Sequence, residues 1–139
     1  METACISLFR IPSEAEREAF LTTLASALKA ESRVRTAFVF GSFVRGGPFR
    51  DVDIGLEFDE PFTLLEVSRL ADRLWAATGR PDFDPDVVPL NDAPPAFRLE
   101  VDSTGRVVRE RSAGDALEFG VRARSEAIDL LEALSGGVR

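Results

Sequence analysis

A chain of 139 residues, 45% of them apolar, is long enough for one globular domain with one hydrophobic core. Its formal net charge of −7 argues against a free-standing nucleic-acid-binding protein and suits a basic partner or a site that collects cations. The chain has no histidine and one cysteine, Cys5, which excludes an internal disulfide, cysteine-based zinc binding and Ser-His or Cys-His nucleophilic catalysis. No signal peptide or long apolar span is recognisable, so a cytoplasmic protein without membrane attachment is expected.

The N-terminal part of the chain predicts one helix, preceded by a short edge strand or an irregular arm over residues 1–11. Ser13 and Glu16 are three residues apart, as in a capping box, and predict a helix start. The helix should fade near Ala30–Ser32. Its buried face is expected to contain Phe20, Leu24, Ala27 and Leu28.

The stretch from residue 34 to residue 58 predicts two strands joined by a tight turn. Val34–Phe40 is short and apolar and predicts a central strand that ends at Gly41. Segment 43–50 contains Gly-Gly-Pro and has room for one helical turn at Phe43–Arg45. Asp51–Phe58 then alternates as a second strand. One face carries Val52, Ile54, Leu56 and Phe58, and the other carries Asp51, Asp53, Gly55 and Glu57.

The next segment predicts a helix that crosses over to a third strand. Thr63 and Glu66 form a second capping box, and Gly79 supplies the helix end. The buried stripe of this helix is expected to contain Leu64, Val67, Leu70, Leu74 and Trp75. The third strand lies within Asp82–Leu90, and its two prolines restrict it to a short or edge position.

The C-terminal part predicts a helix, a short strand and a long helix. Asp92 is the expected cap of the first helix, which Gly105 ends, and Arg106–Arg111 is the expected strand. The last helix should run from Gly114 to Leu134, before Gly136-Gly137. Its face contains Phe119, Ala123, Ala127, Leu130 and Leu134, with Arg122 and Arg124 on the solvent side. The whole chain, residues 1–139, is expected to form a single α/β domain.

The acidic face of the second strand is the candidate functional site. Asp51 and Asp53 have Cα atoms about 6.5–7 Å apart on that face. Carboxylates at this spacing can converge on two divalent cations about 3.5–4 Å apart. The Gly41-Ser42 turn can present backbone N–H groups to a phosphate. An acidic pair alone is more often a solvated strand surface, but the combination indicates a site for a metal-bound nucleoside triphosphate.

Two metal ions need a further carboxylate, and the third strand offers one. Asp82, Asp84 and Asp86 share one parity along it. Asp86 is the preferred candidate because Val87-Val88 fixes its part of the strand more firmly. Asp84 remains the alternative.

These motifs resemble a known family. Val39-Phe40-Gly41-Ser42, Arg45-Gly46 and Asp51-Val52-Asp53-Ile54 resemble the signature of the polymerase-beta-type nucleotidyltransferase superfamily, and within it the minimal nucleotidyltransferase (MNT) group. Segments 86–90 and 105–108 resemble the third carboxylate strand and the closing strand of that group. Eight residues separate Ser42 from Asp51, a shorter loop than is usual in the group.

The resemblance implies a small mixed sheet packed with helices, and a two-metal nucleotidyl transfer from ATP. Asp51, Asp53 and Asp86 would hold two Mg²⁺ ions, and Asp86 would also help to activate or orient the acceptor hydroxyl. Gly41 and Ser42 would contact the β- and γ-phosphates, with Arg45 as a phosphate clamp.

The resemblance also implies a partner. Many proteins similar to the MNT group are antitoxins paired with HEPN-domain ribonucleases, and some transfer AMP to a tyrosine of the toxin. This chain has no tyrosine, so the acceptor is expected on a separate protein. An adenylyltransferase antitoxin is the leading hypothesis. The alternatives are a catalytically impaired domain that neutralises its partner by binding alone, and a nucleotidyltransferase for a small molecule such as an antibiotic.

Overall fold

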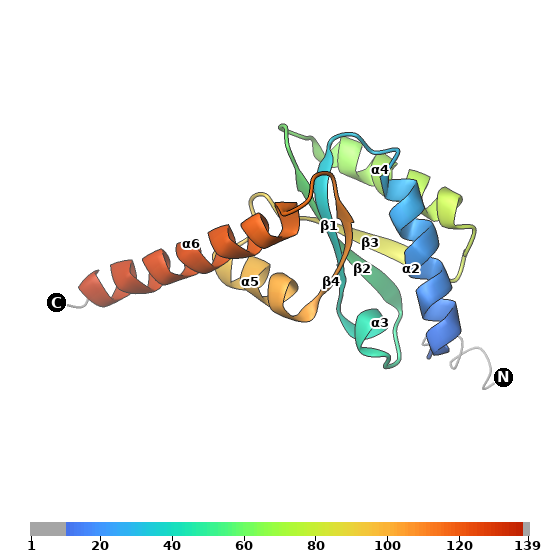
Figure 1. The fold of residues 1–139 in the computed structure, drawn as a ribbon, viewed down its shortest axis with the longest axis horizontal. Coiled ribbons are helices and arrows are strands. Elements are labelled where there is room, and N and C mark those ends of the chain that lie inside the picture. The colour runs from blue at the N-terminus through green and yellow to red at the C-terminus, as the bar shows by residue number, and fades with distance from the viewer. Residues whose placement is uncertain (1–10, 138–139) are drawn as a thin grey trace.

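In a computed structural model, residues 11–137 form a four-stranded mixed sheet with helices on both faces (Figure 1). The elements are α2 (Glu14–Leu28), β1 (Val34–Phe40), α3 (Ser42–Arg45), β2 (Asp51–Phe58), α4 (Leu64–Thr78), β3 (Asp84–Pro89), α5 (Pro95–Thr104), β4 (Arg106–Glu110) and α6 (Asp115–Gly137). The expected N-terminal strand or arm lies almost wholly outside the described residues. None of the helices within residues 11–137 is long and apolar enough to cross a bilayer.

The sheet has the strand order β3-β2-β1-β4. β1 pairs antiparallel with both β2 and β4, whereas β2 pairs parallel with β3. The parallel pair follows from the α4 crossover, because a helix between two strands returns the chain in the original direction. The central position of β1 and the edge position of β3 are both confirmed.

Two apolar clusters lie on opposite faces of the sheet. The larger cluster packs α2 and α4 against the apolar face of β2, which contributes Val52, Ile54, Leu56 and Phe58 as predicted. The smaller cluster lies under α5 and α6 and contains Phe38, Leu90, Val101, Ala116 and Phe119. The acidic face of β2 therefore belongs to the side of the sheet that α5 and α6 partly cover.

Both predicted capping boxes are present, at Ser13 and at Thr63. The stripe predicted for α4 is only partly buried. Val67, Leu70 and Leu74 are buried, but Leu64 in the first turn is 81% exposed and Trp75 is 37% exposed. Trp75 lies at the margin of the stripe, where its indole N–H donates to the carbonyl of Arg80 at 3.1 Å.

The start of α5 differs from the prediction. The cap is Pro94 rather than Asp92, and the helix begins at Pro95. A residue that precedes a proline is disfavoured in the helical conformation, and Ala93 and Pro94 both precede one. Pro94 accordingly has an extended backbone, with φ −56° and ψ 145°.

The long helix α6 continues three residues past the predicted end at Leu134. Phe119 and Ala123 are buried as expected, but Leu130 and Leu134 are exposed. Figure 1 shows the cause, since the C-terminal half of α6 extends beyond the sheet and the other helices.

Candidate active site at the start of β2 and β3

The register between β2 and β3 brings four aspartates together. Asp51 pairs with Asp84, and Asp53 pairs with Asp86. Paired residues in a sheet project from the same face, so all four carboxylates lie on one face at the start of the two strands. Asp51 and Asp53 are half-buried, whereas Asp84 and Asp86 are exposed.

Asp82 shares the sequence parity of these residues but does not join them. It precedes β3, and its carboxylate accepts hydrogen bonds from the Arg80 guanidinium at 3.1 and 3.0 Å. Asp86, the preferred third carboxylate, and Asp84, the alternative, make different contacts. Asp86 lies close enough to hydrogen-bond Asp53, whereas Asp84 lies opposite Asp51.

Burial and neighbouring carboxylates disfavour the charged forms of two of the four aspartates, Asp53 and Asp84. Burial raises the pKa of Asp53, and the charges of Asp86 and Asp51 add to this effect, while the nearby Arg45 opposes it. Burial also raises the pKa of Asp84, with further contributions from Asp51 and Asp86. A cation bound among these groups would relieve the repulsion, because opposite charge favours the ionised carboxylate.

Gly41 lies directly against the acidic cluster. Its neighbour Phe40 is paired with Asp53 across β1 and β2, and a Cβ atom at Gly41 would lie 2.2 Å from Asp53 Oδ2. The φ angle of Gly41 is 79°, a conformation that residues with side chains rarely adopt. Only glycine therefore allows the turn before α3 to approach the carboxylate this closely.

An aromatic cluster anchors the loop between β1 and β2. Phe43 and Phe49 are both buried, although they belong to a short polar segment rich in glycine. Their rings contact each other at 4.9 Å between centroids, and both contact Phe83 just before β3, at 5.4 and 5.1 Å. Phe20 of α2 completes the cluster. Sequence reasoning missed this anchor, although two phenylalanines in such a loop are a signal for it.

The donor set fits a hard divalent cation. Carboxylate oxygens are the ligands that Mg²⁺ prefers, and the Asp53–Asp86 contact with Asp51 nearby supplies them. Within residues 11–137, however, no three such side chains are already arranged as a closed metal-binding group. The assignment of Asp51, Asp53 and Asp86 as metal ligands therefore stays a prediction.

The opposite end of the same strand face is closed by the protein itself. Glu57 is only 5% exposed, accepts a hydrogen bond from Thr36 Oγ1 at 3.0 Å and pairs with Arg122 of α6 at 2.6 Å. Glu57 thus meets a cation supplied by the protein itself, rather than water or a ligand. The expectation that Arg122 belongs to a solvated face is wrong, because its guanidinium is half-buried on Glu57.

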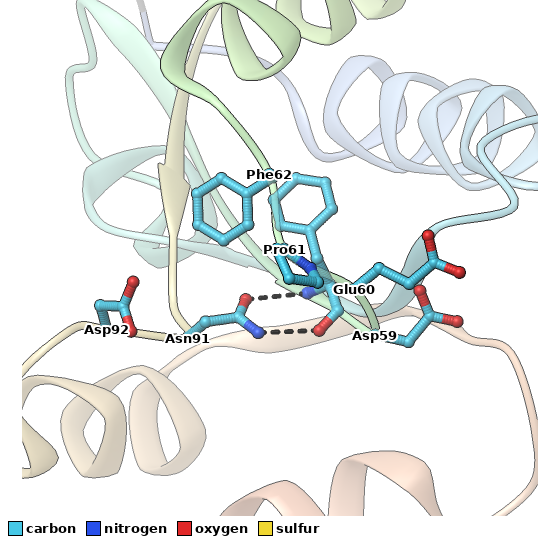
Figure 2. Close-up of a pocket in the computed structure, with 7 residues that line it drawn as sticks. Asp59, Glu60, Pro61, Phe62, Asn91 and Asp92 are labelled. Carbon is cyan, nitrogen blue, oxygen red and sulfur yellow. Dashed lines mark hydrogen bonds between the residues drawn. The ribbon is translucent and has the colours of Figure 1, made fainter.

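The pocket in Figure 2 is also at this far end of β2. It has a volume of about 410 Å³ and is lined by Phe58, Asp59, Glu60, Pro61, Phe62, Asn91 and Asp92. The Asn91 side chain accepts from the backbone N–H of Phe58 at 2.9 Å and donates to its carbonyl at 2.7 Å. Asn91 thereby extends the contact between the two strands beyond Pro89, where β3 ends. The pocket does not include any of the predicted site residues.

Comparisons with known proteins agree with this architecture. The model of the family "Polymerase beta, Nucleotidyltransferase" matches residues 22–113. No curated protein sequence matches the chain. Among solved structures, the chain is similar to one of a tri-AMPylated Shewanella oneidensis HEPN toxin in complex with an MNT antitoxin, with a TM-score of 0.68 and 20% identity over 88% of this chain and 95% of that chain.

Two further structures show the same similarity. One is a toxin–antitoxin crystal structure with AMP-PNP, with a TM-score of 0.69 and 21% identity over 85% of this chain and 94% of that chain. The other is the toxin–antitoxin MntA–HepT, with a TM-score of 0.66 and 20% identity over 87% of this chain and 95% of that chain. At these identities the similarity establishes the fold.

Proposed function

This chain belongs to the polymerase beta nucleotidyltransferase family, and from that premise we propose that it is a single-domain, MNT-type antitoxin that adenylylates its partner. The donor is ATP, and the acceptor is a tyrosine hydroxyl of a cognate HEPN-type toxin. The similar structures support this choice, since one contains a tri-AMPylated HEPN toxin with an MNT antitoxin and another contains AMP-PNP.

The observation that carries the proposal is the pairing of Asp53 with Asp86 beside Gly41. It places carboxylates from two strands next to a turn whose backbone approaches them without an intervening side chain. Phosphoryl-type transfer requires mainly positioning and charge neutralisation, and it needs no histidine. The chain, which lacks histidine, supplies acidic oxygens and backbone N–H groups at one place.

The residues have distinct proposed roles. Asp51, Asp53 and Asp86 would hold two Mg²⁺ ions, which supply neutralisation of the triphosphate charge when bound. Gly41 and Ser42 bind the β- and γ-phosphates through the turn, and Arg45 clamps a phosphate oxygen. This orients the α-phosphorus toward the acceptor.

The transfer itself makes one bond and breaks one. The acceptor oxygen bonds to the α-phosphorus as the bond from that phosphorus to the pyrophosphate oxygen breaks, so pyrophosphate leaves. The proton of the acceptor hydroxyl passes to a carboxylate, for which Asp86 at the exposed side of the cluster is the candidate, and from there to water.

The test is transfer of label to the partner. The protein is incubated with Mg²⁺, ATP labelled in the α-phosphate and the purified toxin, and the toxin is then analysed for label. Asp53→Ala should lower the rate by more than about a hundredfold, since even outer partners of metal ligands contribute about 10- to 100-fold. Asp72→Ala, an exposed aspartate on α4, is the matched control and should keep the wild-type rate.

One alternative has a specific observation in its favour. The loop between Ser42 and Asp51 is only eight residues long, and three carboxylates are not already gathered as a metal group within residues 11–137. Both features suit a domain that neutralises its partner by binding alone. Toxin inhibition that survives Asp53→Ala, without label on the toxin from the wild type, would establish that alternative and reject transfer.

A further inference from the structure

The C-terminal half of α6 is an unpartnered apolar surface. We call residues 127–136 the distal arm; Figure 1 shows this part of α6 extending away from the rest of the molecule. Ile128, Leu130, Leu131 and Leu134 are all exposed, and Leu131 and Leu134 expose 65% and 61% of their surface. Four large apolar side chains so close together on an exposed helix mark an interaction site rather than the scattered apolar residues of an ordinary surface.

The arm is held by the helical segment before it. Arg122 of α6 pairs with the buried Glu57 of β2, and Glu126 pairs with Arg98 of α5, which is itself buried. Among the described residues, no hydrogen bond or ion pair joins the helix to the body beyond Glu126. The contacts of Arg122 and Glu126 therefore fix the direction of the arm, while the side chains of the arm itself remain uncovered.

The apolar residues of the arm gather on one side of the helix. At 100° per residue, Ile128, Leu131 and Leu134 follow one another at spacings of three residues, with Leu130 beside them. Asp129 and Glu132 lie on the other side. This is the pattern of a helix that lays an apolar face into a groove of a partner.

Charge identifies the kind of partner. Residues 125–136 contain three carboxylates, Glu126, Asp129 and Glu132, and no lysine or arginine. Two copies of the chain that paired along this segment would bring like charges together, which disfavours self-association. A groove with an apolar floor and a lysine- or arginine-bearing rim would match both the apolar and the acidic side of the arm.

We propose that the distal arm is the docking element for the acceptor protein, which presents such a basic-rimmed apolar groove. This inference rests on the proposed function for the identity of the acceptor. Asp53 and Glu57 project from the same face of β2, and α6 is attached to that face through Glu57. The part of α6 that precedes the arm thus lies on the side of the sheet that carries the acidic cluster.

The experiment compares two double variants of the full chain that add the same charge. Leu131→Glu with Leu134→Glu alters the apolar face, whereas Ser125→Glu with Ala133→Glu alters the polar side. Affinity for the purified HEPN-type toxin is measured by calorimetry, labelling by AMP transfer, and the nucleotide site by the shift in Tm that Mg²⁺ with AMP-PNP produces. Circular dichroism verifies that both variants are folded.

The apolar-face variant should bind the toxin at least about 30-fold more weakly and keep the nucleotide-induced shift, because buried apolar anchors dominate helix-in-groove interfaces. The polar-side variant should lose much less affinity for the toxin. Wild-type affinity in the apolar-face variant would overturn the docking proposal. So would a wild-type dimer that this variant converts to a monomer with toxin binding unchanged.

The outcome separates the two proposals. If the wild type binds the toxin without labelling it, and the apolar-face variant does not bind, then adenylyl transfer fails while the docking proposal is supported. If the wild type labels the toxin, and the apolar-face variant labels and binds it equally well, then transfer stands and the docking proposal fails.

Discussion

The two ends of β2 carry carboxylates on the same face of the sheet, yet the burial and the charge partners of these carboxylates differ. Glu57 at the end of the strand is buried and has both a hydroxyl donor, Thr36, and a cation, Arg122. Asp51 and Asp53 at its start are half-buried and lie opposite further aspartates on β3. Next to Asp53, the positive charge of Arg45 partly offsets the charges of the neighbouring aspartates.

The difference separates a structural carboxylate, Glu57, from the carboxylates of the candidate site. A buried charge is tolerated when the fold provides its partner, as it does for Glu57. Burial and nearby carboxylates raise the pKa of Asp53 and of Asp84, so the ionised forms of these two groups cost the folded state free energy unless a cation binds there. A cation bound at the start of β2 would therefore stabilise the folded state.

The largest expected effect is stabilisation by nucleotide. Mg²⁺ with AMP-PNP at about 100 times its Kd should raise the free energy of unfolding by about 2.7 kcal/mol, which calorimetry or thermal melting detects as a higher Tm. Asp53→Ala should abolish the shift, and Glu57→Gln should retain it relative to its own baseline. A shift that disappeared in Glu57→Gln but not in Asp53→Ala would place the nucleotide site at the end of β2 that carries Glu57 and contradict its assignment to the start of the strand.

A smaller loss of stability is expected from Gly41→Ala. The substitution should cost about 2 kcal/mol, because a side chain is strained at positive φ and its Cβ would collide with Asp53. Gly79→Ala is the matched control, with positive φ but no atom within 4 Å of the added Cβ. Urea denaturation should show the greater loss at Gly41, and equal losses would mean that the contact with Asp53 contributes nothing.

Removal of the structural carboxylate should be costly at the other end of the strand. Glu57→Ala leaves Thr36 and the half-buried Arg122 without their acceptor and should lower the free energy of unfolding by about 1.5 kcal/mol. Glu60→Ala, which removes an exposed carboxylate 3.7 Å from Arg33, should change it by less than about 0.5 kcal/mol. Chemical denaturation of both variants and of Arg122→Ala gives the change in the free energy of unfolding, and hence the contribution of the Glu57–Arg122 pair.

The smallest effect is a gain in stability from Asp53→Asn without metal. The folded-state pKa of Asp53 is raised, so the native state prefers the protonated carboxyl and loses stability as the pH rises from the unfolded-state value through the folded-state value. At neutral pH the asparagine variant should melt at a higher temperature than the wild type. Below about pH 3.8 the difference should vanish, because the carboxyl is then protonated in both states. A variant less stable than the wild type at pH 7 would contradict this sign.

Much of this architecture follows from local patterns. All four strands lie within their predicted ranges, because short apolar runs or the alternation of apolar and polar residues indicate them. Both capping boxes mark helix starts because they satisfy backbone groups locally. The candidate site was likewise visible as Asp51 and Asp53 after a Gly-Ser turn, although its metal and phosphate roles stay predictions.

What the patterns did not reveal depends on contacts between distant segments. Alternation placed Glu57 on the same face as Asp53 but contained no information on α6, which supplies Arg122. Periodicity likewise assigned Leu130 and Leu134 to a buried face, yet the helix leaves the sheet before reaching them. The burial of Phe43 and Phe49 depends on Phe83, a residue far along the chain.

The two edges of the sheet have a consequence for how the molecule associates. An open strand edge is a template for uncontrolled pairing with other chains and hence for aggregation. Here β3 contains Pro85 and Pro89, which have no N–H to donate, and β4 is five residues long and carries Arg106, Arg109 and Glu110. Neither edge is suited to accept a foreign strand, so stable complexes of this protein should form through its helices, and concentrated solutions should resist fibril growth.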